Sequence, residues 1–267
     1  MNKKKSYDYP KKYDDHMISV RHRKDLPVLD ANFPYRNLSF KGKSTRFLTY
    51  LGCYIVAFPL MWLFTGLKIK GRKNLKKHKA VLKNGGITIC NHVHMWDTIC
   101  LHKAIRPIKT FQPAWAVNFT GPNRFLIRGI GGMPIPSNIS GLKSLLKTKD
   151  QILKEGKWLH FFPEVSMWFY YEAIRPFKKG AFSFAVKHNK PILPICINYR
   201  KAKGFRKIFR RGSPYFLTIN IGELIFPNQD LAKREAIEDL LNKSRSVMQA
   251  MSEFEEIIPQ ERIHRGD

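Results

Sequence analysis

The sequence predicts an α/β fold, a single domain with a central mixed sheet flanked by helices and preceded by an apolar helical segment. From about residue 85, short apolar runs alternate with longer mixed segments, a texture typical of alternating strands and helices. An uncharged run stands just before this region. The chain has 267 residues, 43% of them hydrophobic, enough to bury a core. We therefore divide it into an extension (1–46), an apolar segment (47–67) and the α/β domain (68–267).

Within the domain, the spacing of apolar residues predicts where each strand and helix begins and ends. The run at 216–221 alternates with period two, which predicts a half-exposed strand. At the end of the chain, apolar residues from Ile237 to Phe254 recur at helical spacing, behind Asn228 and Asp230 as possible caps. The other expected strands are 87–90, 158–162 and 192–198, and the other expected helices are 97–104, 140–155 and 181–188.

The first 46 residues carry many Lys and Arg, three prolines and no sustained apolar period. Such a composition favours a loose extension over a packed element. Its charge suits a lipid surface.

The run from Phe47 to Leu67 is uncharged and about as long as a bilayer-spanning helix. A buried core helix is the alternative, although soluble helices are rarely apolar all round for so long. Lysine and arginine flank the run on both sides, which argues against a simple crossing. A helix or helical hairpin bent near Pro59 that dips into one leaflet accounts for both flanks.

The chain carries 48 Lys and Arg against 20 Asp and Glu, a formal net charge of +28. This excess predicts attraction to a polyanion, and both nucleic acid and anionic lipid fit. The segment from Arg200 to Arg211 interleaves cations with Phe205, Ile208 and Phe209, which suits lipid headgroups as well as nucleic acid. Beside a membrane segment the lipid interpretation is the better one, so we expect membrane phospholipid and no nucleic acid as partner.

The four cysteines are scattered and form no Cys-x-x-Cys pair. They are interpreted as reduced, buried thiols. The first 30 residues or so lack the apolar stretch of a secretory signal. We therefore expect a membrane-associated protein on the cytosolic face.

The candidate chemistry lies in the segment ITICNHVHMWDTICLHKA, where an apolar strand delivers Asn91 and His92 into a turn and Asp97 opens the next helix. Across such a turn an aspartate can fold back to the imidazole. A carboxylate on one ring nitrogen fixes the tautomer and supports the charge formed when the other nitrogen takes a proton. His92 and Asp97 are thus a candidate general-base pair.

Two other interpretations of these residues stay open at this point. A lone histidine is more often a packing or solvent-facing residue, and His92, His94 and Asp97 could together hold a metal ion. No further Cys or His pair stands at ligand spacing, so the metal interpretation is the weaker.

The Asn-His-x-x-x-x-Asp pattern at Asn91, His92 and Asp97 resembles the first motif of the glycerolipid acyltransferase family, lysophosphatidic acid acyltransferases in particular. Further blocks resembling that family's follow in its order. Each is weak alone, but several in order are hard to obtain by chance. The blocks are RFLIRGIGGMPIPS at 124–137, Phe162, Pro163 and Glu164, RPFKKGAFSFA at 175–185, and KPILPI at 190–195.

The resemblance implies acyl transfer from acyl-CoA or acyl-carrier protein to the free hydroxyl of a lysophospholipid, most directly 1-acyl-glycerol-3-phosphate. His92 would remove the proton, Asp97 would orient His92, and Glu164 would help to hold the acceptor. No cofactor, no metal and no covalent enzyme intermediate are expected. The positions implied for substrate binding are Asn91, Phe162, Pro163, Glu164, Ser166, Arg175 and Lys178.

The chain departs from the family pattern in two places. The second motif normally ends in arginine, where Ser137 or Asn138 stands here, and the third normally continues Gly-Thr-Arg, where Val165, Ser166 and Met167 stand. In the family those arginines are thought to bind the acceptor's phosphate.

Two consequences for the acceptor are possible. Either Arg175, Lys178 and Lys179 supply the charge, or the acceptor is another lysolipid or a glycolipid. A third possibility, from another class, is a basic membrane- or nucleic-acid-binding protein without catalysis.

Overall fold

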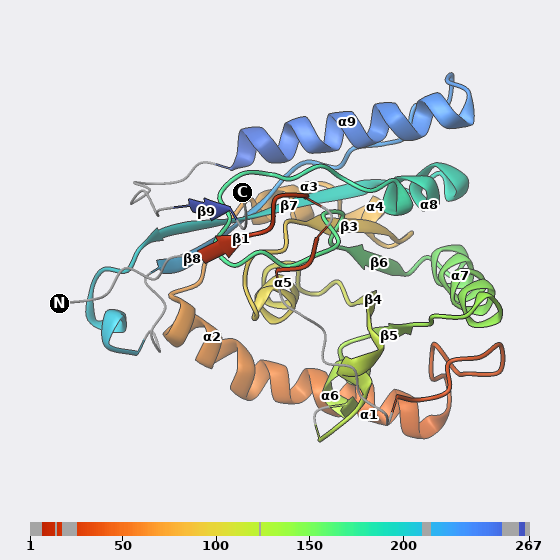
Figure 1. Ribbon diagram of the computed structural model, residues 1–267, viewed down its shortest axis with the longest axis horizontal. Coiled ribbons are helices and arrows are strands. Elements are labelled where there is room, and N and C mark those ends of the chain that lie inside the picture. The colour runs from red at the N-terminus through yellow and green to blue at the C-terminus, as the bar shows by residue number, and fades with distance from the viewer. Residues whose placement is uncertain are drawn as a thin grey trace.

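The computed structural model describes residues 7–13, 15–17, 26–122, 124–209, 215–252 and 262–264. Within these ranges the main feature is a seven-stranded sheet of order β2-β8-β7-β3-β6-β4-β5 (Figure 1). All neighbouring strands are parallel except β7 and β8. The sheet is therefore mixed and the α/β prediction is confirmed. Its strands are β2 Lys68–Lys70, β3 Gly86–Cys90, β4 Thr110–Trp115, β5 Gly132–Ile135, β6 Trp158–Phe161, β7 Ile192–Lys201 and β8 Tyr215–Ile221; β1 Tyr7–Tyr9 pairs separately with β9 Arg262–His264.

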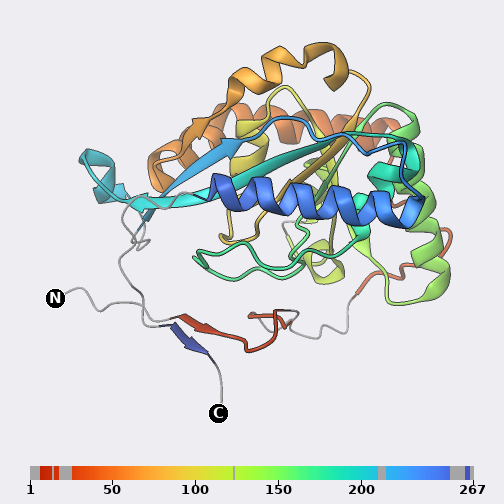
Figure 2. The ribbon, with the colours of Figure 1, turned by 90° about the horizontal axis from the view of Figure 1, so that it is seen from above.

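Helices cover both faces of the sheet (Figures 1 and 2). One core cluster joins the sheet to α2, α3 and α5, and the other joins it to α7, α8 and α9. Strand β7 contributes side chains to both clusters, because its successive residues point to opposite faces of the sheet: Leu193 packs in the first cluster and Ile192 in the second. The helices are α1 Phe40–Gly52, η1 Cys53–Ala57, α2 Phe58–Thr65, α3 Arg72–Lys77, α4 Lys79–Leu82, α5 Asp97–Ala104, η2 Ala116–Phe119, α6 Arg124–Gly129, α7 Ile139–Lys154, α8 Gly180–His188, η3 Phe205–Phe209 and α9 Lys233–Met251.

Strand β3 lies at the centre of the sheet between β6 and β7, and all its residues are buried. Burial on both faces explains why its sequence is a short β-branched run without alternation. Because β3, β6 and β4 run parallel, their carboxyl ends meet at one edge. The segments that follow β3 and β6 therefore lie side by side, where α/β sheets usually bind ligands.

The apolar segment forms continuous helix from Phe40 to Thr65, seven residues earlier at its start than predicted. The Ser39 hydroxyl accepts a hydrogen bond from the Gly42 N–H and caps it. Before Pro59 the helix widens into the π-helical turn η1, where Phe58 donates to the Cys53 carbonyl. A proline cannot donate to the carbonyl four residues earlier, which accounts for the wider turn. The segment is one helix, not a hairpin.

This helix is long and apolar enough to cross a membrane, and only 28% of its most apolar window is buried. Tyr50 and Phe58 pack inward, whereas the outward positions carry large apolar side chains. A core helix would bury most of this surface, so the exposure favours membrane association over the soluble alternative. The exposed set is Phe40, Phe47, Leu48, Leu51, Tyr54, Ile55, Val56, Leu60 and Trp62.

The described part of residues 1–46 is docked on the fold, so the prediction of a loose extension is wrong there. Leu29 and Tyr35 are buried, and the Tyr35 hydroxyl donates to the Leu29 carbonyl. Near the start of the chain, Tyr9 is buried as well. Aromatic and apolar residues set among the charges give this segment something to bury.

Strand β8 is buried at all its residues except Asn220, which corrects the prediction of a half-exposed strand. Its aliphatic positions pack in the cluster with α2 and α5. On the alternate positions, the Arg200 guanidinium crosses the Phe216 ring and donates to the Thr218 hydroxyl. The long Arg200 side chain thus covers the face of β8 that the alternating pattern predicted to be exposed to solvent.

The caps expected for the last helix are also wrong. Helix α9 begins at Lys233 behind Ala232, with no side-chain cap. The Asn228 side chain accepts instead from the Asp230 N–H in a local turn. Phe254, the last residue of the predicted stripe, lies outside the described residues.

Candidate active site

Asn91 fixes the start of the turn that follows β3, which we call the catalytic turn (Asn91–Asp97). Its side-chain amide donates to the Ile197 carbonyl at 3.0 Å, and its oxygen accepts from the Ile197 N–H at 2.8 Å. The amide thus continues the ladder between β3 and β7 and is buried. Asn91 positions the turn and does not face a substrate.

His92 and Asp97 meet across the turn as predicted, with His92 Nδ1 3.0 Å from Asp97 Oδ2. The same oxygen accepts from the backbone N–H groups of Val93, at 2.7 Å, and His94, at 3.0 Å. Asp97 also lies in the first turn of α5, where the helix dipole favours negative charge. These donors hold the carboxylate in the orientation that receives the Nδ1 proton.

The two side chains of this pair differ in exposure: Asp97 is 1% exposed and His92 24%. Among the described residues nothing bonds His92 Nε2, so that nitrogen is available to a bound hydroxyl. A buried orienting carboxylate and an accessible ring nitrogen are the parts of a general base.

The Phe162 ring packs against one face of the His92 ring. The two rings stack with centroids 3.9 Å apart and an interplanar angle of 15°. Behind Phe162, the buried His160 packs edge-on, and its Nδ1 lies 2.8 Å from the Thr88 hydroxyl. Burial keeps the pKa of His160 well below its ordinary value, so this second histidine is neutral.

Glu164 joins the catalytic turn to the loop after β6. Its Oε2 accepts from the His92 N–H at 3.1 Å and from Arg175 Nη2 at 3.0 Å, and its Oε1 accepts from the Arg175 N–H at 2.9 Å. Both side chains are 1% exposed. Burial raises the pKa of Glu164, and the Arg175 charge opposes that shift. The pair positions the His92 backbone from inside the protein.

The remaining predicted residues line the loop from Phe162 to Lys178, which we call the third-motif loop. Ser166 is buried and accepts from Arg175 Nη1 at 3.1 Å. The Pro163 carbonyl accepts from the Lys178 N–H at 2.9 Å, and Lys178 is exposed. The expectation that Arg175 contacts a phosphate does not fit its burial, whereas Lys178 lies at the surface.

Two residues that the sequence did not single out shape the turn through their backbone. The Trp168 N–H donates to the His92 carbonyl and the Tyr170 N–H to the Val93 carbonyl, each at 3.0 Å. The Trp168 ring lies 4.5 Å below the Arg175 guanidinium. The aromatic run MWFYY was the available signal, because such a run beside a charged loop predicts burial.

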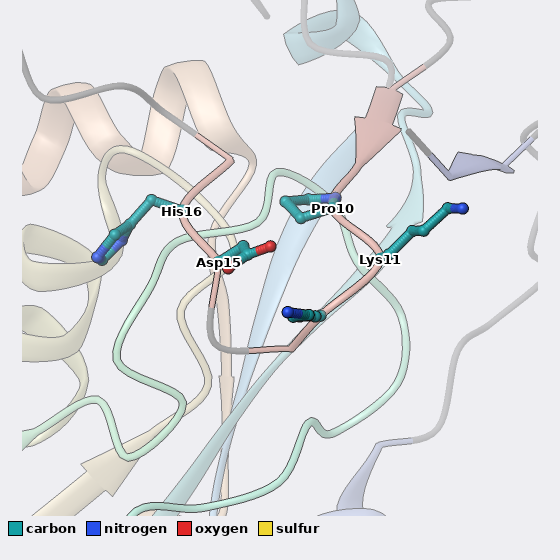
Figure 3. Close-up of a pocket in the computed structure, with 5 residues that line it drawn as sticks. Pro10, Lys11, Asp15 and His16 are labelled. Atoms are coloured by element: carbon teal, nitrogen blue, oxygen red, sulfur yellow. The ribbon is translucent and has the colours of Figure 1, made fainter. Parts of the chain in front are cut away.

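A second element that the sequence did not predict lies over this loop, the strap formed by residues 9–13 and 15–17. The Asp15 carbonyl accepts from the Ser166 hydroxyl and from Trp168 Nε1, both at 3.0 Å. Tyr9 stacks on Trp168 with centroids 5.7 Å apart. Figure 3 shows a pocket whose described lining residues all belong to the strap, and none of them is a residue of the His92 site.

His94, considered above as a metal ligand, is turned into the protein. Its Nδ1 accepts from the Trp96 N–H at 3.2 Å, and burial lowers its pKa. Across the described ranges, no three His, Cys, Asp or Glu side chains are grouped so that they could hold a metal ion. The second-motif position is explained similarly, since Asn138 accepts from the Gly141 N–H and caps α7.

Comparison with known proteins identifies the family to which this fold belongs. The family model described as Acyltransferase matches residues 66–198, from the end of α2 through the catalytic turn to β7. The chain belongs to this family. No curated protein matches it in sequence.

Among solved structures, the fold is similar to that of the 1-acyl-sn-glycerophosphate (LPA) acyltransferase PlsC from Thermotoga maritima. The TM-score is 0.56 at 18% sequence identity, and the match covers 82% of this chain and 86% of that chain. This likeness covers a larger share of the chain than the family model does.

Proposed function

We propose that the protein transfers a fatty acyl group from acyl-CoA or acyl-carrier protein to the free hydroxyl of a lysophospholipid. The acceptor we favour is 1-acyl-glycerol-3-phosphate, which would give phosphatidic acid. The observation that carries the proposal is the 3.0 Å contact between the accessible His92 ring and the buried Asp97 carboxylate. The name of the PlsC structure supports the acceptor class.

In the proposed mechanism, His92 Nε2 takes the proton of the acceptor hydroxyl as its oxygen attacks the thioester carbonyl. Asp97 Oδ2 accepts the Nδ1–H and stabilises the imidazolium. The tetrahedral intermediate then expels the thiolate, which receives the proton back from His92. Phe162 restrains the ring plane throughout, and Glu164 with Arg175 holds the His92 backbone. No cofactor is needed for this chemistry.

The headgroup of the acceptor is the second part of the proposal. With Arg175 buried and Met167 at a motif arginine, Lys178 is the candidate among the predicted residues for the phosphate. The same loss of arginines favours the alternative that the acceptor is a lysolipid with a different head. We place the enzyme on the cytosolic face of a membrane, where acyl-CoA and acyl-carrier protein are found.

The test is acyl transfer by purified protein in detergent, with labelled acyl-CoA or acyl-carrier protein and a panel of lysolipids. His92→Ala should lower kcat by about 10²- to 10⁴-fold, the usual contribution of a general base. His188→Ala, at a histidine paired with Asp150 away from the site, is the matched control. Transfer to another lysolipid only would select the alternative acceptor, and full activity of His92→Ala would overturn the mechanism.

A further inference from the structure

The hairpin between β7 and β8 ends in an exposed tip of mixed character, residues 201–209. Phe205 and Ile208 are 66% and 83% exposed, in the short helix η3. Lys203 and Lys207 are exposed among them. Large apolar side chains this exposed are costly in water, and the lysines beside them would be costly in a protein interface core.

The tip lies against the end of the apolar helix. Arg206 Nη1 donates to the Trp62 carbonyl at 3.3 Å, and its guanidinium lies 4.6 Å from the Trp62 ring. In Figures 1 and 2 the turn after β7, in cyan, stands beside the end of α2. Its exposed side chains therefore continue the exposed apolar surface of α1 and α2.

The base of the same hairpin is tied to the catalytic turn. Tyr199 in β7 and Tyr215 in β8 pack on Tyr170, with ring centroids 5.2 and 5.7 Å away. Tyr170 donates its N–H to the Val93 carbonyl, and its ring contacts His94. Tyr170 therefore contacts both the base of the hairpin and the catalytic turn.

We infer that the tip of the β7–β8 hairpin is a second membrane contact, which binds anionic phospholipid. Lys203 and Lys207 meet the headgroup phosphates while Phe205 and Ile208 enter the acyl boundary. The inference rests on the membrane association proposed above and extends it, because α1 and α2 supply apolar surface without selecting lipid charge. Nucleic acid would use the lysines and leave the continuous apolar surface in water.

The experiment places a polarity-sensitive fluorophore at the tip. All four cysteines of the chain are buried, so a cysteine introduced as Ile208→Cys is labelled selectively. The labelled full-length protein is placed in nanodiscs of phosphatidylcholine, with or without phosphatidylglycerol. Lys233→Cys, on α9 across the sheet, provides the matched control label.

We expect the Ile208 label to shift to the blue and to resist iodide quenching in anionic discs, and to do so less in neutral discs. The double variant Lys203→Gln, Lys207→Gln should shift the docking equilibrium about 30-fold toward the undocked state. Each lysine near an anionic surface contributes a similar free energy of binding, and the variant loses both contributions. The Lys233 label should not respond to lipid charge.

Equal accessibility of the Ile208 label in both kinds of disc would overturn the inference, as would an unchanged response after the double substitution. Acyl transfer measured in the same discs separates this outcome from failure of the proposed function. If the tip binds nucleic acid and the Ile208 label does not respond to anionic lipid, the inference is overturned in favour of a nucleic-acid contact.

Discussion

The catalytic turn and the apolar helix are built in opposite ways. In the turn, single atoms matter: Asp97 Oδ2 alone receives three donors, and Asp97 is almost fully buried. Along α1, η1 and α2, most of the apolar surface is exposed and interchangeable. The turn therefore depends on geometry, whereas the helix depends on total apolar area.

The difference teaches where a substitution acts sharply and where it acts by degrees. Removing one acceptor from the turn changes the chemistry at once, whereas removing one apolar side chain from the helix leaves its neighbours in place. The Glu164–Arg175 pair belongs with the turn in this respect, because it is almost fully buried and holds the His92 N–H by a single hydrogen bond.

The largest expected effect is on catalysis. Asp97→Asn should lower kcat by about 10²- to 10⁴-fold, because an amide oxygen can still accept these hydrogen bonds but carries no negative charge to stabilise the imidazolium that forms on His92. Steady-state acyl transfer measures it, and Asp150→Asn, in the surface pair with His188, is the control. A loss confined to KM would contradict the role of Asp97 in orienting the base.

Next comes stability. Arg175→Met leaves Glu164 as a buried charge without its partner, and should lower the free energy of unfolding by about 3–5 kcal/mol. Chemical denaturation in detergent measures this change. Adding Glu164→Gln should recover part of the loss, since no buried charge then remains.

A matched ion pair on the surface supplies the control for that prediction. Asp239→Asn breaks the exposed contact with Lys243 on α9 and should cost no more than about 0.5 kcal/mol. Equal losses from the buried and the exposed pair would show that the Glu164–Arg175 network does not support the fold.

The smallest expected effect is on membrane binding. Ile55→Ser removes one exposed apolar side chain from η1 and should weaken vesicle binding about tenfold, measured by co-sedimentation. Phe226→Ser, at an exposed phenylalanine near the start of β7, should leave binding unchanged. Complete release by Ile55→Ser would mean that the helix acts through a specific contact.

Much of the fold could be predicted because its signals are local. The apolar runs of β3, β6 and β7, and the helix from Asp97 to Ala104, are found where their patterns placed them. The meeting of His92 and Asp97 also follows from a strand-to-helix turn, which the spacing indicated. The burial of β8 could not be predicted, because Arg200, which lies over Phe216, is charged and is therefore expected at the surface.

The buried pair that supports the catalytic turn could not be predicted from the sequence for a different reason. Arg175 and Glu164 are eleven positions apart. The family resemblance implied that Glu164 holds the acceptor, and Arg175 was one candidate for the acceptor's phosphate, so a buried pair between them was not predicted. Their burial depends on Trp168 and on the strap, whose contacts are long-range. Pairing across such distances leaves no periodic trace in the chain.

The strap gives the catalytic site a particular place in the order of folding. Its hydrogen bonds to Ser166, Trp168 and Phe169 join residues 151, 153 and 160 positions apart. Contacts between such distant positions form late, since a long loop must close first. We therefore expect the strap to settle over the third-motif loop only after the sheet beneath that loop has assembled.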